Sequence, residues 1–159
     1  MSRTINSIEV ESLSYEKLRL LMDNDPTLHL EEVPFGSYQL ELDLCHEVYS
    51  NVQELGYLQC YSVYVNKEYA GYMVVGASEM MHYKDHVQGI ADSFYIKPEY
   101  RNSGAFSKLL FEVELSLKSN NIEYLTLGMN PNMPHYAKMM EYVSKLGYQT
   151  TEILMTKEL

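Results

Sequence analysis

The chain lacks the features that mark several large protein classes. Its 159 residues contain no tryptophan and only two cysteines, and Cys45 and Cys60 do not have the spacing of a metal site or a disulfide framework. We therefore expect two buried thiols in a reducing compartment. No run approaches the roughly 20 apolar residues that span a membrane, and the first residues do not resemble a signal peptide. These absences predict a cytoplasmic protein.

Basic residues are scarce as well. The chain has 12 Lys and Arg residues against 22 Asp and Glu residues, which gives a net charge of -10. No Lys/Arg cluster is large enough to neutralise a row of phosphates, and this argues against a nucleic-acid partner. An acidic surface attracts cations, so the charge is compatible with an amine substrate, although acidity also serves solubility alone.

What is present is the composition of a globular domain. Hydrophobic residues make up 46% of the chain, and no repeat or Gly/Ser linker interrupts it, so we expect a single domain over residues 1–159. Apolar periodicity and turn residues predict six strands and four helices in a mixed α/β order. The expected strands cover residues 6–10, 58–65, 70–78, 89–97, 122–129 and 148–157, and the expected helices cover 15–22, 38–55, a stretch after Gly104, and 135–146.

The most informative segment joins an expected strand to an expected helix. A strand-like run at 93–97 is followed by Pro98, by Arg101 and by Gly104, after which a helical pattern begins. A glycine-bearing turn before a helix N-terminus leaves backbone N–H groups without intrahelical partners, and the helix dipole favours an anion there. The sequence therefore predicts a phosphate-bearing cofactor at this turn.

Two motifs carry a resemblance to a known family. The segment YRNSGAF at 100–106 is similar to the Arg/Gln-x-x-Gly-x-Gly/Ala turn of the Gcn5-related N-acetyltransferases, the GNAT superfamily, and KLGY at 145–148 is similar to the Lys-x-Gly-Phe/Tyr ending of that family's fourth helix. The element order resembles this family over nearly the whole chain, and the segments around Asp92 and His82 are similar to phage-encoded members. The resemblance implies a mixed, mostly antiparallel sheet of about six to seven strands flanked by four helices.

The resemblance also implies acetyl-CoA as cosubstrate. Its pantetheine arm would lie between the fourth and fifth strands and pair with the backbone of the fourth, and a fourth-strand N–H would polarise the thioester carbonyl. The loop after the fifth strand would add a contact from Asn132. The implied backbone contacts are Phe94, Tyr95 and Ile96 for the arm and Arg101, Asn102, Ser103, Gly104, Ala105 and Phe106 for the diphosphate.

The chain departs from the family pattern at two positions. Phe106 stands where the family has Gly or Ala, although its backbone N–H is retained. Val143 stands where the family often has a tyrosine that protonates the leaving thiolate. The candidate acids are therefore Tyr142, its neighbour, and Tyr136, seven residues before Val143 on the same helical face.

Asp92 is the candidate general base. It lies at the strand edge nearest the expected acyl site and would act through water on the substrate ammonium group. A solvent-facing or turn-stabilising carboxylate is the alternative interpretation, and Glu79 is the alternative base. His82 and His86 lie in an expected loop with no third ligand in view, so we expect no metal site.

The function expected from the residues and the resemblance is acetyl transfer to a primary amine by direct attack in a ternary complex. The acceptor stays open between a small amine, a peptide N-terminus and a lysine side chain, and a homodimer is common in the family. The alternative is a catalytically degenerate member that binds a partner protein, and transfer of another acyl group, or modification of nucleic acid, is a third reading.

Overall fold

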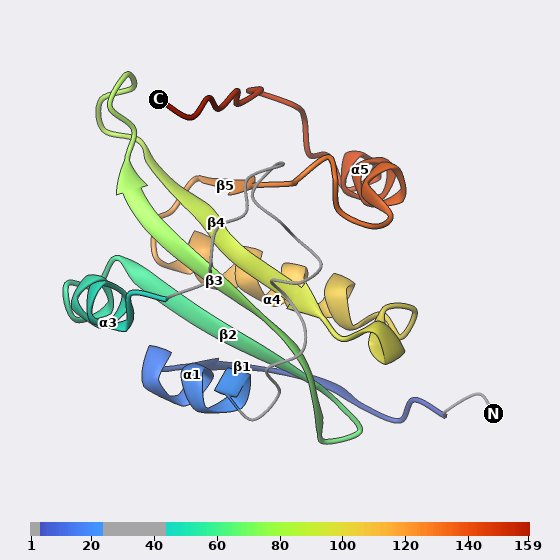
Figure 1. Cartoon of the computed structure of the whole chain (residues 1–159). Coiled ribbons are helices and arrows are strands. Elements are labelled where there is room, and N and C mark those ends of the chain that lie inside the picture. Colours follow the sequence, from blue (N-terminus) through green and yellow to red (C-terminus); the bar gives the residue numbers. More distant parts are fainter. Residues whose placement is uncertain (1–3, 24–43) are drawn as a thin grey trace.

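The computed structural model describes residues 4–23 and 44–159. These residues form a five-stranded sheet in the order β1-β2-β3-β4-β5 (Figure 1). Neighbouring strands are antiparallel from β1 to β4, whereas β5 runs parallel to β4. The strands are β1 (Ile8–Leu13), β2 (Leu58–Val65), β3 (Glu68–Glu79), β4 (Val87–Ile96) and β5 (Tyr124–Leu127).

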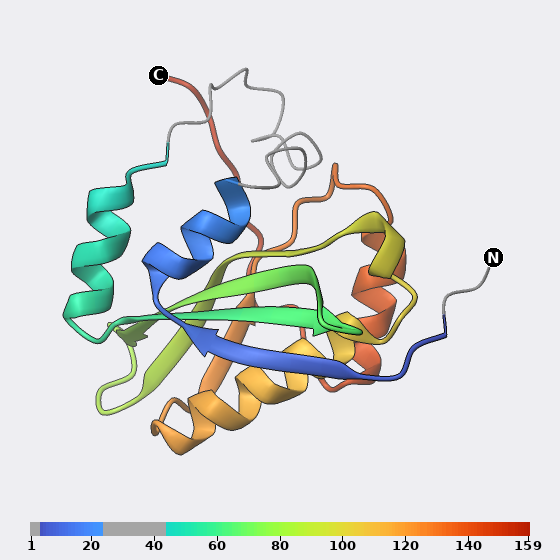
Figure 2. The ribbon, with the colours of Figure 1, turned by 90° about the horizontal axis from the view of Figure 1, so that it is seen from below.

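Four α-helices flank the sheet in the described part of the chain. Helices α1 and α3 lie on one face of the sheet and α4 on the other (Figure 2). None of these helices is both long and apolar enough for a membrane span. The helices are α1 (Tyr15–Asp23), α3 (His46–Glu54), α4 (Ala105–Ser119) and α5 (Tyr136–Lys145), and a 3-10 turn, η1 (Pro98–Tyr100), follows β4.

Each face of the sheet has its own core, because successive side chains of a strand point to opposite faces. On the α4 side, Met73 and Val75 pack with Leu109 and Val113, and none of the four is exposed. Full burial of one such side chain stabilises the fold by about 1.5–3 kcal/mol. The core on the α1 and α3 side is partly aromatic, and its buried members are Tyr15, Leu18, Leu58, Cys60, Tyr72, Val74 and Tyr95.

A tight turn joins β2 to β3. The sequence predicts a hairpin with a turn over 66–69, and the structure confirms the hairpin with only Asn66 and Lys67 between the strands. Both residues have positive φ, 52° and 69°, as a type I′ turn requires. Asn66 is held there because its Oδ1 accepts hydrogen bonds from the N–H groups of Asn6 and Ser7 at 2.8 and 3.2 Å.

Replacing Lys67 by glycine is expected to stabilise the protein. A left-handed conformation is costly for lysine and free for glycine, so Lys67→Gly should raise the free energy of unfolding by about 1 kcal/mol. Urea unfolding measures this directly. Lys118→Gly, in the exposed part of α4, is the control and should lower the free energy of unfolding by about 1 kcal/mol. A loss of stability in Lys67→Gly would contradict the strain argument.

The mixed, mostly antiparallel fold is confirmed, but three sequence predictions are wrong. Over residues 4–23 and 44–159 the sheet has five strands rather than six to seven, and residues 148–157 form no strand. Of the two thiols expected to be buried, Cys45 is exposed. Cys60 is buried as predicted, and burial raises the pKa of its thiol to about 12. The helix expected at 38–55 is α3, which begins only at His46, and residues 38–43 lie outside the described residues.

The missing last strand has a physical explanation. The segment after Gly147 is rich in β-forming residues, but a strand needs a hydrogen-bonded neighbour and a face to cover. The segment pairs with none of the five described strands, and it covers little, since Ile153, Leu154 and Met155 are 80%, 82% and 92% exposed. Local pattern alone therefore overestimates the width of the sheet.

Candidate functional site

The ladder between β4 and β5 is short. It joins residues 88–91 of β4 to residues 124–127 of β5 and ends at the pair Ala91 and Leu127. Strand β4 continues to Ile96 while still paired with β3 on its other side. The second half of β4, residues 92–96, therefore presents an edge that β5 does not cover, as the resemblance implies.

A β-bulge at Asp92 changes the direction of this edge. On β3, Val74 pairs with Ser93 and Val75 pairs with Ala91, so Asp92 is the extra residue. A bulge shifts the in–out alternation of its strand by one residue. As a result, Ala91 and Phe94 both contact the core on the α4 side although three positions separate them.

The bulge also decides which main-chain groups face the uncovered edge. The N–H of Lys97 donates to the carbonyl of Ala70 on β3 at 2.9 Å. In an antiparallel ladder such bonds occur at every second residue, so the main-chain groups of Tyr95 also face β3. Those of Phe94 and Ile96 face the other way, and the Ile96 carbonyl accepts a hydrogen bond from Arg101 Nε at 3.0 Å.

The turn between η1 and α4 supplies N–H groups for an anion. Gly104 has φ +86° and α4 begins at the next residue. Ser103 Oγ accepts the N–H of Ala105 at 3.1 Å and donates to the carbonyl of Tyr100 at 2.6 Å, which fixes the turn. Four N–H groups have no hydrogen-bond acceptor among the described residues, and they belong to Asn102, Gly104, Phe106 and Ser107.

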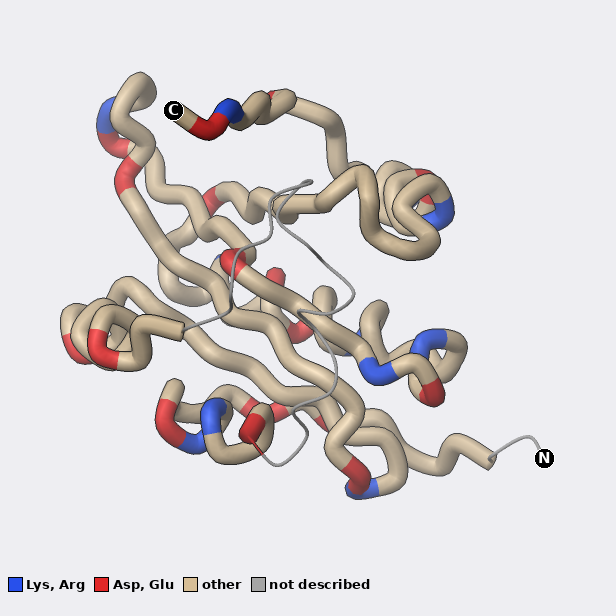
Figure 3. The backbone as a smooth tube through the Cα atoms, viewed as in Figure 1, with Lys and Arg blue, Asp and Glu red and all other residues tan. Residues whose placement is uncertain are grey.

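This turn is locally basic in an acidic chain. Residues 97–108 contain the cations Lys97, Arg101 and Lys108 and the single anion Glu99 (Figure 3), although Lys108 forms an ion pair with Glu112; the whole chain carries -10. Directed N–H groups at a helix N-terminus combined with local positive charge favour a phosphate or diphosphate. The residues present therefore fit the diphosphate of a CoA ester.

The side chain of Phe106 packs into the protein. Its ring centroid lies 5.6 Å from that of Phe94 and 6.0 Å from that of Tyr142, and the ring belongs to the apolar layer under α4. Its N–H is one of the four groups described above. An aromatic residue at this position therefore leaves the anion-binding amides in place.

The candidate acids occupy different places. The hydroxyl of Tyr142 is 2.6 Å from Ser107 Oγ in the first turn of α4, beside the turn, whereas Tyr136 opens α5 and is half-buried. Val143 is buried. Asn132 lies exposed in the preceding loop, where its N–H donates to Asn130 Oδ1 at 2.9 Å.

The structure places the candidate base on the sheet face that carries α1 and α3. Asp92 is exposed, and its Oδ2 accepts a hydrogen bond from the Tyr49 hydroxyl of α3 at 2.7 Å. Burial, followed by this hydrogen bond, raises the pKa of Tyr49, so the hydroxyl stays a donor. Sequence reasoning missed Tyr49, whose only signal is its helical spacing from His46, three residues earlier on α3.

The remaining candidates lie elsewhere. Glu79 is exposed at the end of β3. His86 Nδ1 contacts Glu123 Oε2 at 2.6 Å, His82 is exposed, and no cluster of three metal-ligating side chains occurs in the described ranges.

The comparisons with known proteins concern structure. The sequence matches no family model and no curated protein. A predicted acetyltransferase from Clostridium acetobutylicum, solved with acetyl-CoA, is similar with a TM-score of 0.69 and 14% identity over 96% of both chains. AAC(6')-Iy, solved with the bisubstrate analogue CoA-S-monomethyl-acetylneamine, is similar with a TM-score of 0.68 and 10% identity over 97% of this chain and 99% of that one.

A third similar structure has a different description. It is a transcriptional regulator from Bacillus halodurans, with a TM-score of 0.72 and 10% identity over 96% of this chain and 100% of that one. At such identities the likeness concerns the fold, which agrees with the short β4–β5 ladder and the turn before α4. The chain has the fold of the Gcn5-related N-acetyltransferases.

Proposed function

We propose that the protein transfers the acetyl group of acetyl-CoA to a primary amine. The observation that carries this proposal is that two binding elements follow one another along the chain, one on β4 and one in the turn before α4. The uncovered edge of β4 at Phe94 and Ile96 suits the amide groups of a pantetheine arm. The turn that follows the same strand offers four N–H groups to a diphosphate. The two elements occur in the order in which CoA carries these parts.

The chemistry needs little more from the chain. Acetyl-CoA supplies an acyl thioester, and the amine nitrogen bonds to its carbonyl carbon while the carbon–sulfur bond breaks. Before the attack, Asp92 removes a proton from the substrate ammonium group through a water molecule, which gives the neutral amine its lone pair. The CoA thiolate can leave without being protonated by a general acid, because a thiol has a pKa near 8.5. Tyr142 and Tyr136 are the candidates for returning a proton to it.

The acceptor proposed is a small cationic amine. Similar structures include aminoglycoside acetyltransferases and a glucosamine-6-phosphate N-acetyltransferase from Arabidopsis thaliana. A net charge of -10 attracts a cation and so supports an amine that carries several positive charges. A cytoplasmic location, where acetyl-CoA is available, is part of the proposal.

The second candidate is a partner-binding protein without catalysis. Two observations favour it: Val143 replaces the tyrosine that often serves as acid, and the hydroxyl of Tyr142 lies against Ser107. One of the similar structures is described as a transcriptional regulator. This candidate retains the fold and allows CoA binding, so only turnover separates it from the first.

Turnover is measured by thiol release from acetyl-CoA over a panel of polyamines, aminoglycosides, amino sugars and lysine peptides. We expect acetyl-CoA to bind with micromolar affinity in calorimetry and a small polycationic amine to give the highest kcat/KM. Binding without turnover on any amine would favour the second candidate. Absence of binding to both acetyl-CoA and CoA would contradict the proposed function.

A further inference from the structure

Helix α3 reaches across the sheet to the bulge on β4. Its residue Tyr49 lies 43 positions before Asp92 in the sequence, and the two side chains meet through the hydrogen bond of 2.7 Å from Oη to Oδ2. Asp92 is the extra residue of the bulge and has no partner in the ladder with β3. The contact from α3 therefore holds the side chain of a residue that lacks a ladder position of its own.

We propose that Tyr49 is a positioning residue for the acetyl transfer, because its hydroxyl fixes the Asp92 carboxylate in the orientation from which it accepts a proton. This inference rests on the proposed function. Tyr49 touches neither the acyl group nor the amine in this scheme and acts only through Asp92.

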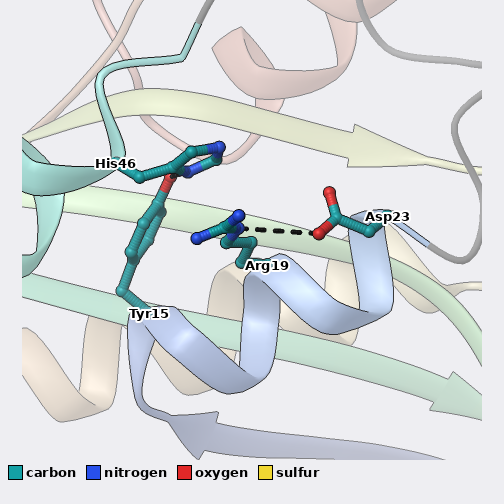
Figure 4. A network of polar contacts seen from close by, with 4 residues as sticks. All are labelled: Tyr15, Arg19, Asp23 and His46. Carbon is teal, nitrogen blue, oxygen red and sulfur yellow. Dashed lines mark hydrogen bonds and ion pairs between the residues drawn. The ribbon is translucent and has the colours of Figure 1, made fainter.

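The ring of Tyr49 is itself held in place. It stacks on Tyr15 of α1 with a centroid distance of 4.7 Å and an interplanar angle of 11°. The Tyr15 hydroxyl lies 2.9 Å from His46 Nδ1 (Figure 4), and the Tyr15 N–H donates to Gln53 Oε1 at 2.8 Å. One face of α3 carries His46, Tyr49 and Gln53. The first and last of these residues hydrogen-bond to Tyr15, and Tyr49 lies between them on the helix.

The second residue of the bulge is held in a similar manner. Ser93 interacts with the hydroxyl of Tyr72 of β3, whose pKa is raised by burial and lowered by this interaction. Two tyrosine hydroxyls, one from α3 and one from β3, thus contact the two consecutive residues at which β4 changes its alternation. Burial is the largest cause of the raised pKa of each tyrosine, so both hydroxyls stay protonated.

The geometry leaves room for the chemistry. A carboxylate has two oxygens with about four acceptor sites, and Tyr49 occupies one site on Oδ2. Among the described residues, no hydrogen bond or ion pair involves Oδ1, which is left for the water or ammonium that the reaction requires. Without the hydroxyl, an exposed aspartate rotates among several staggered conformations, and only a fraction of the molecules holds a reactive orientation at any moment.

The test is Tyr49→Phe, which keeps the stacked ring and removes only the hydroxyl. We expect kcat to fall about tenfold, as for a loss of orientation rather than of the base itself, with KM for acetyl-CoA changed less than about twofold. In the double variant Tyr49→Phe/Asp92→Asn, kcat should equal that of Asp92→Asn alone, because residues that act as a unit are not additive.

A matched control removes a tyrosine hydroxyl on the other face. The Tyr61 hydroxyl contacts Gln59 Oε1 and lies 2.8 Å from Ser116 Oγ of α4, so Tyr61→Phe also loses hydroxyl hydrogen bonds but should keep the wild-type kcat. Wild-type kcat in Tyr49→Phe, or an additive double variant, overturns the positioning role while the proposed function stands. If the unaltered protein shows no turnover with any amine, both are overturned together.

Discussion

Gly104→Glu is expected to abolish binding of acetyl-CoA, with the Kd raised at least about 100-fold. Gly104 has φ +86°, a conformation that costs a residue with a Cβ about 1–2 kcal/mol. The new carboxylate would stand among the N–H groups of Asn102, Phe106 and Ser107, where it competes with the diphosphate and repels it. Calorimetric titration with acetyl-CoA measures the effect.

The control for Gly104→Glu separates binding from stability. Gly56 has φ +80°, and a Cβ there would meet nothing within 4 Å, so Gly56→Glu carries the same backbone strain away from the turn. Both variants should unfold at similar urea concentrations, and only Gly104→Glu should lose binding. If the affinity of Gly104→Glu for acetyl-CoA were unchanged, the turn before α4 would not be part of the cofactor site.

The second large effect is expected from Asp92→Asn, which should lower kcat about 100-fold, equivalent to about 2.7 kcal/mol of activation free energy. Asparagine has nearly the same shape, and its carbonyl oxygen accepts the hydrogen bond from Tyr49, so the bulge and its contacts are retained. The amide accepts no proton, so the substrate ammonium group stays charged and cannot attack the thioester. Affinity for acetyl-CoA should be unchanged, since cofactor contacts come from other residues.

The initial rate of thiol release, measured with saturating acetyl-CoA and amine, gives kcat for Asp92→Asn. Glu79→Gln is the control, because it removes the same charge from the exposed end of β3 and should leave kcat unaltered. A reversal of the two results would assign the base to Glu79. If both variants had the same kcat as the unaltered protein, neither Asp92 nor Glu79 would be the general base.

The sequence predicts the parts of the fold that local pattern controls. The apolar spacing of α4 places Leu109, Leu110, Val113 and Leu117 in the core, and all four are buried. The turn before α4 follows from Gly104 because its chemistry is contained in one short segment. The strand expected at 148–157 fails for the opposite reason, because a strand depends on a neighbour that the sequence does not specify.

The candidate site is predictable only where it is local. The bulge at Asp92 depends on the register of β4 against β3, and a register cannot be obtained from either strand alone. The contact between Tyr49 and Asp92 joins α3 to β4 across 43 positions, and several tyrosines of this chain could have served equally well. For the same reason, the contact of the Tyr142 hydroxyl with Ser107 could not be predicted from the sequence, because it depends on how α5 lies against α4.

The parallel pairing of β5 has a consequence for how the molecule opens. β1 to β4 join through antiparallel ladders along the sheet, whereas β5 reaches β4 only after the chain has passed through α4. No residue of β5 is fully buried, and α5 buries only Val143. Segments with so little burial open locally at low free-energy cost and exchange their amide hydrogens early. We therefore expect β5 and α5 to exchange early, and a ligand bound between β4 and the start of α4 to slow that exchange.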